Sequence, residues 1–168
     1  MAITINHELA GENTGGIIPK GDYEAFISKC DIDCTQNGKL FIDMVFTVRE
    51  DVEQACKKRT VFHKIWSVKD PSATDNVEGY PTWAIQGMSK SAAIENGKSF
   101  DTIEAWCSDM VGRVVQVVID HEEYNDKTRA IAKFVNRSNN PREKFEVEGV
   151  TPNNGGDFIP ANDTEIPF

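Results

Sequence analysis

Apolar side chains at every second position between residues 40 and 49 limit the fold of this chain more than any other feature. Successive side chains of a strand point to opposite faces, so a period of two predicts a β-strand with one face in a core. The even positions would form the core face and the odd positions a mixed outer face. The even positions are Leu40, Ile42, Met44, Phe46 and Val48, and the odd ones are Phe41, Asp43, Val45, Thr47 and Arg49.

Flanking segments predict four more strands. Residues 23–34 suit a strand, and Asn37-Gly38 is a hairpin signal leading into residues 40–49, because both residues tolerate positive backbone angles. Alternation returns at residues 59–66. Residues 113–120 and 128–137 predict a final hairpin, with a turn at residues 122–127 between them.

Between the third and fourth predicted strands the pattern becomes helical. Residues 81–96, with Thr82 as a candidate cap, and residues 101–111 predict two helices. Trp83 and Trp106 lie at helical spacing and are expected in the core. Three strands, a helical insertion and a hairpin follow the order of the five-stranded OB-fold barrel. We therefore expect a mainly β OB-fold domain at residues 19–140, a flexible arm at 1–18 and a flexible acidic tail at 141–168.

The composition excludes several classes of function. A net charge of −9 requires any DNA site to be a local basic patch. The sequence has no membrane-length apolar run and opens without a secretory signal, which predicts a cytoplasmic protein with reduced thiols. Cys30 and Cys34, and Cys56 and His63, lack a matching second pair, so no metal is expected. No residue set typical of catalysis or of cofactor binding is present, and the prediction is that the protein is not an enzyme.

Aromatic and basic residues interleave on the predicted outer faces of the second and third strands. Stacking surfaces for bases and cations for phosphates are what single-stranded nucleic acid needs. Alternatively, Phe62 and Trp66 close a barrel end or pack under the helix, and the basic cluster at residues 57–59 is a solvated loop. The residues predicted to bind single-stranded DNA are Phe41, Arg49, Lys57, Lys58, Arg59, Phe62, Lys64, Trp66, Tyr124, Lys127 and Arg129.

The chain ends in an acidic stretch that closes on Ile-Pro-Phe. Pro167 restricts the backbone and presents Phe168 to an apolar pocket of a partner, whose basic rim would meet the carboxylates. This tip resembles that of bacterial and phage single-stranded-DNA-binding proteins. The resemblance implies recruitment of replication and recombination enzymes such as a helicase, an exonuclease or a recombination mediator. The predicted docking residues are Asp163, Glu165, Ile166, Pro167 and Phe168.

A second resemblance covers about residues 17–140 and the tail. It rests on Pro19-x-Gly21-x-Tyr23, the Gly38-Lys39 hairpin, the strand at residues 59–66, and Gly112-Arg113 leading into residues 114–119. These features are similar to a family of phage single-stranded-DNA-binding proteins once classified as a domain of unknown function. The resemblance implies sequence-independent binding of single-stranded DNA during phage replication and recombination, in the host cytoplasm and without a catalytic residue. The resemblance is also compatible with assembly of the protein into a homo-oligomer.

Two other classes of function stay open at this point. The acidic net charge is compatible with an interaction adaptor, in which the barrel binds protein and the tail mimics that of the host single-strand-binding protein. A small nuclease is the enzyme alternative. Binding of labelled oligo-dT with a negative salt dependence separates a DNA-binding protein from the adaptor, and metal-dependent loss of the substrate would identify a nuclease.

Overall fold

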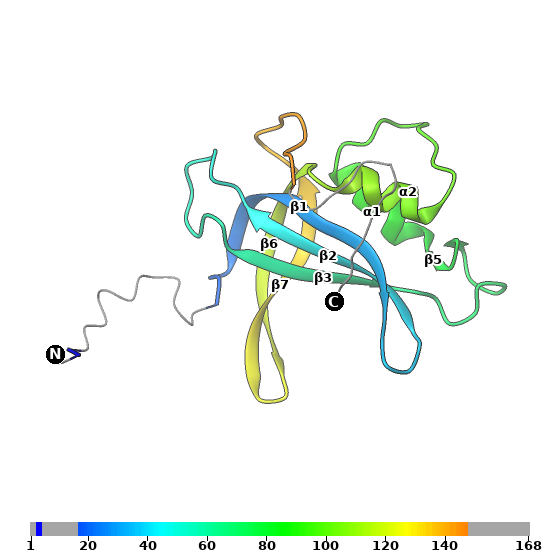
Figure 1. Ribbon diagram of the computed structural model, residues 1–168, viewed down its shortest axis with the longest axis horizontal. Helices are drawn as coiled ribbons and strands as arrows, with labels where there is room; N and C mark the ends of the chain where they lie inside the picture. The colour runs from blue at the N-terminus through cyan, green and yellow to red at the C-terminus, as the bar shows by residue number, and fades with distance from the viewer. Residues whose placement is uncertain (1–2, 5–16, 148–168) are drawn as a thin grey trace.

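The computed structural model describes residues 3–4 and 17–147, and this part of the chain is mainly β (Figure 1). Five long strands form one antiparallel sheet, and two short strands precede two helices. The long strands are β1 (Gly21–Cys34), β2 (Leu40–Val48), β3 (Thr60–Trp66), β6 (Val114–Tyr124) and β7 (Lys127–Arg137). The remaining elements are β4 (Asn76–Val77), β5 (Tyr80–Pro81), α1 (Thr82–Ser91) and α2 (Ile103–Met110).

The long strands lie in the order β3-β2-β1-β6-β7. The edge strands β3 and β7 contact each other without pairing, so the sheet is not closed. In Figure 1 the β1–β2 and β6–β7 hairpins project toward the lower edge, and the helices lie at the upper right. Helix α1 contacts β7, and α2 contacts β1. The predicted strands and helices are therefore confirmed in kind and order.

The core forms where the predicted periodicities meet. On β2 the even positions from Ile42 to Val48 are buried, whereas Leu40, next to the hairpin turn, is exposed. On α2, Ile103, Trp106 and Met110 are buried at helical spacing. This confirms the predicted alternation and the core position of Trp106.

The helix starts differ from the prediction at α1. Thr82 is its first helical residue and not its cap, because Pro81 occupies the cap position without a side-chain cap. The Thr82 hydroxyl instead donates to Asp75 Oδ1 at 2.9 Å. In α2, Thr102 is the N-cap, and its side chain accepts a hydrogen bond from the Ala105 amide.

A segment that we call the strap, residues 138–147, packs back onto the sheet. The Phe145 ring stacks on Phe26 with centroids 4.5 Å apart, and the Phe145 amide donates to the Gly112 carbonyl at 2.8 Å. Gly112 has φ of 92°, and a Cβ there would lie 2.3 Å from the Phe145 carbonyl oxygen. The packed domain thus extends beyond the predicted boundary at residue 140.

The other predicted boundary also shifts, because Ile18 is buried and its carbonyl oxygen lies 2.8 Å from His121 Nε2. Most of the predicted arm and residues 148–168 of the predicted tail lie outside the described residues. In the part of the chain that the structure describes, no helix has the length and apolarity to cross a membrane.

Candidate nucleic-acid interface

Exposed aromatic rings lie along the outer face of β3, next to a buried ring of β2. Register places Phe41 opposite Trp66 and Val45 opposite Phe62. Phe62 is 63% exposed and Trp66 41% exposed, so neither is buried at a barrel end. Phe41 is buried beneath this face, with its ring centroid 5.0 Å from that of Trp66. Phe41 therefore supports Trp66 and offers little ring surface of its own.

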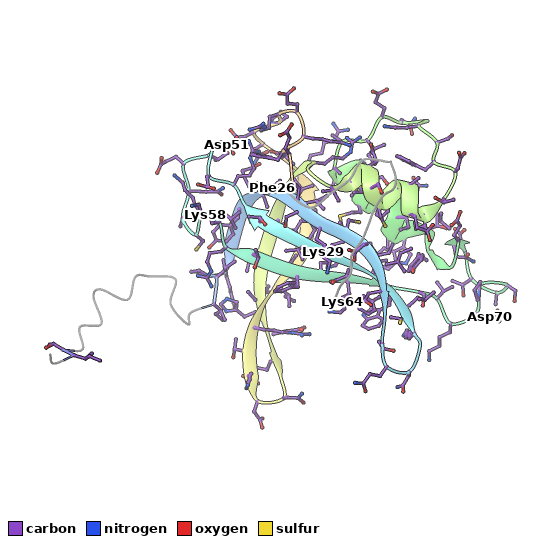
Figure 2. All side chains as sticks on the ribbon, in the orientation of Figure 1. Phe26, Lys29, Asp51, Lys58, Lys64 and Asp70 are labelled. Carbon is purple, nitrogen blue, oxygen red and sulfur yellow. The ribbon has the colours of Figure 1, made fainter. Side chains whose placement is uncertain are left out.

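Lysines accompany these rings. Lys64, labelled on β3 in Figure 2, lies with its Nζ 5.1 Å from the centroid of Phe41. Lys39 Nζ lies 5.0 Å from the centroid of Trp66. A base stacked on Trp66 would thus have ammonium groups close to its phosphate, a combination used by single-strand-binding surfaces.

The exposed rings continue into a groove of about 590 Å³ between β3, α1 and β7, which we call the aromatic groove. Trp66 and Trp83 line it together with Phe134, and Lys64 and Lys133 lie among them. Trp83 is 79% exposed and Phe134 56% exposed. The groove therefore combines three solvent-facing rings with two lysines.

The prediction that Trp83 belongs to the core is wrong. The buried stripe of α1 contains Ile85 and Met88. Trp83 precedes Ile85 by two residues, and residues two apart lie on different helix faces. That offset was a signal in the sequence.

Phe134 and Lys133 were also missed as candidates. The register of β6 and β7 shifts between Val118 and Ile119, so Phe134 opposes Val118 and Ala132 opposes Ile119. Lys133 is the extra residue of this bulge. A bulge reverses which face the following side chains occupy, so simple alternation misplaces Phe134.

His63 also lines the groove, and burial lowers its pKa. Because the pKa moves down from an ordinary value near 6.5, His63 is neutral at pH 7. Its ring therefore adds polar surface without adding charge.

Carboxylates occupy the outer face of the neighbouring strands. Asp31 on β1 lies opposite Asp43 on β2, and Lys29 Nζ binds Asp43 Oδ2 at 3.1 Å. Burial raises the pKa of Asp31, Asp43 and Asp33 raise it further, and Lys29 opposes them. This acidic face repels phosphate, so a nucleic acid is favoured along β3 and the aromatic groove rather than across β1.

Arg49 differs from its predicted role. Its side chain is 2% exposed and lies 3.5 Å from Glu24 Oε1 and 2.8 Å from Asp51 Oδ2. It also donates to the Asn140 carbonyl at 2.7 Å. Hydrogen bonds from Arg49 are the largest cause lowering the Asp51 pKa to about 2. The guanidinium links β2 to the strap and is not available to a phosphate.

The remaining basic candidates lie at other ends of the sheet. Lys57 pairs with Glu53 at 3.9 Å and Lys58 with Glu50 at 3.8 Å, in the loop that leads through Arg59 into β3. Lys58 is exposed and labelled beside this loop in Figure 2. The structure therefore supports a charged loop at the start of β3, with partial neutralisation by neighbouring carboxylates.

The β6–β7 hairpin carries the last candidates. Lys127 is exposed, and Arg129 Nε donates to Glu122 Oε2 at 2.6 Å. The Tyr124 side chain lies outside the described residues, as do the docking residues Asp163, Glu165, Ile166, Pro167 and Phe168. The structure thus brings together Phe41, Phe62, Lys64 and Trp66, but not the hairpin cations.

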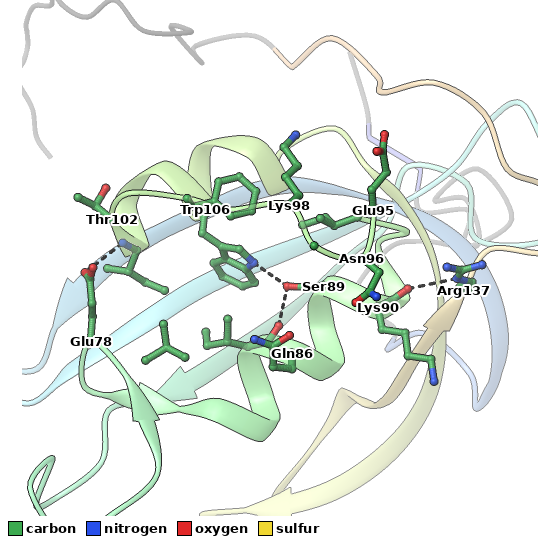
Figure 3. Close-up of a pocket in the computed structure, with 16 residues that line it drawn as sticks. Glu78, Gln86, Ser89, Lys90, Glu95, Asn96, Lys98, Thr102, Trp106 and Arg137 are labelled. Carbon is green, nitrogen blue, oxygen red and sulfur yellow. Dashed lines mark hydrogen bonds between the residues drawn. The ribbon is translucent and has the colours of Figure 1, made fainter.

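A separate cavity of about 610 Å³ lies between α1, α2 and the loop joining them (Figure 3). The buried Trp106 indole donates to Ser89 Oγ at 2.8 Å in its wall, and Glu78 Oε1 accepts from the Ile103 amide. Among the described residues, no group of three His, Cys, Asp or Glu side chains could hold a metal ion.

Comparison with protein families gives one match for this architecture. Residues 6–149 match the family described as "Protein of unknown function (DUF669)". The chain belongs to this family. No curated protein matches it. The DUF669 match spans the sheet, both helices, the strap and the aromatic groove, whereas the Ile-Pro-Phe tip lies beyond it.

Proposed function

We propose that this DUF669 protein binds single-stranded DNA without sequence preference and acts in phage DNA replication and recombination. The observation that carries the proposal is the row of exposed rings from β3 into the aromatic groove, formed by Phe62, Trp66, Trp83 and Phe134. Contiguous apolar patches exposed to solvent mark binding sites. Rings flanked by lysines suit unpaired bases because every base has a π face.

The proposed binding mode divides the work between rings and cations. Stacked bases contribute about 1–3 kcal/mol each, independent of sequence. Lys39, Lys64 and Lys133 would neutralise the adjoining phosphates, and the loop at residues 57–59 would extend this contact beyond β3. The acidic face of β1 and β2 would keep the strand from crossing the sheet.

We also propose that the sheet is a partly open OB-fold. The strand order β3-β2-β1-β6-β7, the helices inserted between β3 and β6, and the approach of β3 to β7 support this assignment. In such folds the face of the second and third strands and the last hairpin bind oligonucleotides. Phe62, Lys64 and Trp66 occupy the corresponding face here.

The acidic tip would recruit partner enzymes while the domain holds DNA. Residues 163–168 have the composition of a docking peptide, and tethering raises their effective concentration near the bound strand. We propose replication and recombination enzymes as the partners on the basis of the tip sequence.

Titration of labelled oligo-dT at two salt concentrations tests the proposed function. Saturable binding that weakens with salt is expected, because neutralised phosphates release counterions. A duplex of equal length is the control and should bind more weakly, since paired bases cannot stack on the rings. Absence of oligo-dT binding, or equal affinity for duplex, would refute the proposal. Absence of binding would then leave the adaptor function as the better reading.

A further inference from the structure

A basic pocket of about 460 Å³ lies where the strap passes the end of β7, and we call it the strap pocket. Its charged lining residues, among those that the structure describes, are Arg113, Arg137, Arg142, Glu143 and Lys144. Four of these five carry positive charge, although the chain as a whole has a net charge of −9. Such a local reversal of sign is typical of an anion-binding surface.

Three cations converge on a single carboxylate beside this pocket. Asp109 Oδ2 lies 2.7 Å from Arg113 Nη2, and Asp109 Oδ1 lies 3.0 Å from Lys144 Nζ and 3.4 Å from Lys98 Nζ. Burial raises the Asp109 pKa, but hydrogen bonds from Lys144 and Arg113 outweigh it and lower the pKa overall. One ionised carboxylate cannot neutralise three cations, so positive charge remains for a ligand.

Arg137 is the cation best placed to bind an added anion. Its side chain is exposed, and its Nε donates to the Lys90 carbonyl at the end of α1, as Figure 3 shows. Among the described residues, no carboxylate pairs with Arg137, and both of its Nη groups remain without a partner. A guanidinium offers its N–H groups in a planar fork that matches two oxygens of a phosphate.

The strap pocket adjoins the aromatic groove. Ser91 and Val135 line the groove, and Ala92 and Arg137 line the strap pocket. A strand rises about 3.3 Å per residue, so Lys133 in the groove and Arg137 are roughly 13 Å apart along β7. A few nucleotides of an extended strand can bridge this distance.

The strap holds its own cations in place before any ligand binds. Arg142 lies over the Phe145 ring at 3.9 Å, and Phe145 is fixed by Phe26 and by the Gly112 carbonyl. A site whose groups are already ordered loses less entropy on binding.

We propose that the strap pocket binds phosphodiester groups of a DNA strand whose bases occupy the aromatic groove. The inference rests on the proposed function and adds a second contact region to it. Because phosphates carry no sequence information, the contact strengthens binding to every sequence and lengthens the occupied site.

The test compares two lengths of oligo-dT over a salt series. Lengths of about 4 and about 16 nucleotides span the site sizes of one such domain. Arg137→Gln removes the charge of an exposed side chain. For the longer oligonucleotide we expect about tenfold weaker binding. The slope of log affinity against log salt should become shallower by about 0.7, the contribution of one phosphate on a single strand. Binding of the shorter oligonucleotide should not change.

Lys69→Gln is the matched control, because Lys69 is exposed in the loop after β3 and lines neither cavity. It removes the same charge, so its effect measures the contribution of net charge alone. Asp109→Asn is the converse variant. It releases three cations and should tighten binding of the longer oligonucleotide with a steeper salt slope, a gain that loss of folding cannot produce.

Several outcomes would overturn the inference. Equal losses of affinity at both lengths would show that Arg137 acts on DNA bound in the aromatic groove. Unchanged affinity at both lengths would show that the strap pocket does not contact the DNA. An acidic peptide that binds in an Arg137-dependent manner, with no effect of Arg137→Gln on the longer oligonucleotide, would assign the pocket to a protein partner. If the unaltered protein binds neither oligonucleotide, the proposed function fails first and the inference falls with it.

Discussion

At the residue scale, Trp83 distinguishes a stacking surface from ordinary exposed apolar area. Trp83→Ala should weaken oligo-dT binding by about 1–3 kcal/mol with an unchanged salt slope, as loss of one stacked base predicts. Trp66→Ala should do the same. Gln86→Ala, an exposed position one turn later on α1 and outside the groove, is the control in the same titration. A folded Trp83→Ala protein with normal affinity would remove α1 from the binding surface.

Arg49 illustrates a buried charge whose partner is a buried carboxylate. Arg49→Met leaves Glu24 buried without this cation, and we expect a loss of about 3–5 kcal/mol in the free energy of unfolding. Glu24→Gln combined with Arg49→Met should cost less than Arg49→Met alone, because no uncompensated charge remains. Urea unfolding measures both variants. A double variant less stable than the single one would contradict this account.

Arg49 also sets a pH dependence through its second partner, Asp51. Its pKa of about 2 in the folded protein lies below the ordinary value of 3.8, so this stabilisation is present above pH 4. It should be lost as pH falls from about 4 to 2. Screening at this exposed carboxylate keeps the effect modest. Unfolding measured across this window should depend less on pH in Arg49→Met, and an identical profile would rule out the pairing.

At the element scale, one close backbone approach helps to hold the strap. Gly97→Ala and Gly112→Ala introduce the same left-handed strain, since φ is 93° and 92°, but nothing lies within 4 Å of a Cβ at Gly97. Gly97→Ala should therefore cost about 1–2 kcal/mol. Gly112→Ala should cost more, because its Cβ displaces the Phe145 carbonyl. Phe145→Ala removes the ring that stacks on Phe26, so the strap can move away from Gly112 and the extra cost of Gly112→Ala should shrink in this background. If urea unfolding shows that the two substitutions lower the free energy of unfolding additively, the strap contact is contradicted.

At the scale of the whole molecule, DNA binding and recruitment should separate. Deleting Ile166-Pro167-Phe168 should leave oligo-dT affinity intact, or slightly higher at low salt, whereas pull-down of replication and recombination enzymes should disappear. Phe168→Ala and one residue added after Phe168 remove the ring and the terminal carboxylate separately, and each should abolish the pull-down. Retention of the same partners by the deleted protein would disprove the docking role.

The sequence by itself determined the five long strands, the two helices and which face of β2 is buried, but not the short strands β4 and β5. Local periodicity sufficed for this, because a strand has a period of two and the even positions of residues 42–48 are all apolar. The core position of Trp106 followed in the same way from helical spacing on α2. Exposure of Phe62 and Trp66 was compatible with their outer face but was not fixed by it.

Only the tertiary structure decided how these elements meet. The burial of Arg49 depends on Glu24 and on strap residues about 90 positions away, and no local pattern reports such a contact. The exposure of Phe134 depends on a bulge opposite Val118 and Ile119, and the aromatic groove exists because β3, α1 and β7 approach without the sheet closing. Periodicity assigns a side chain to a face, but what covers that face depends on segments far away in the chain.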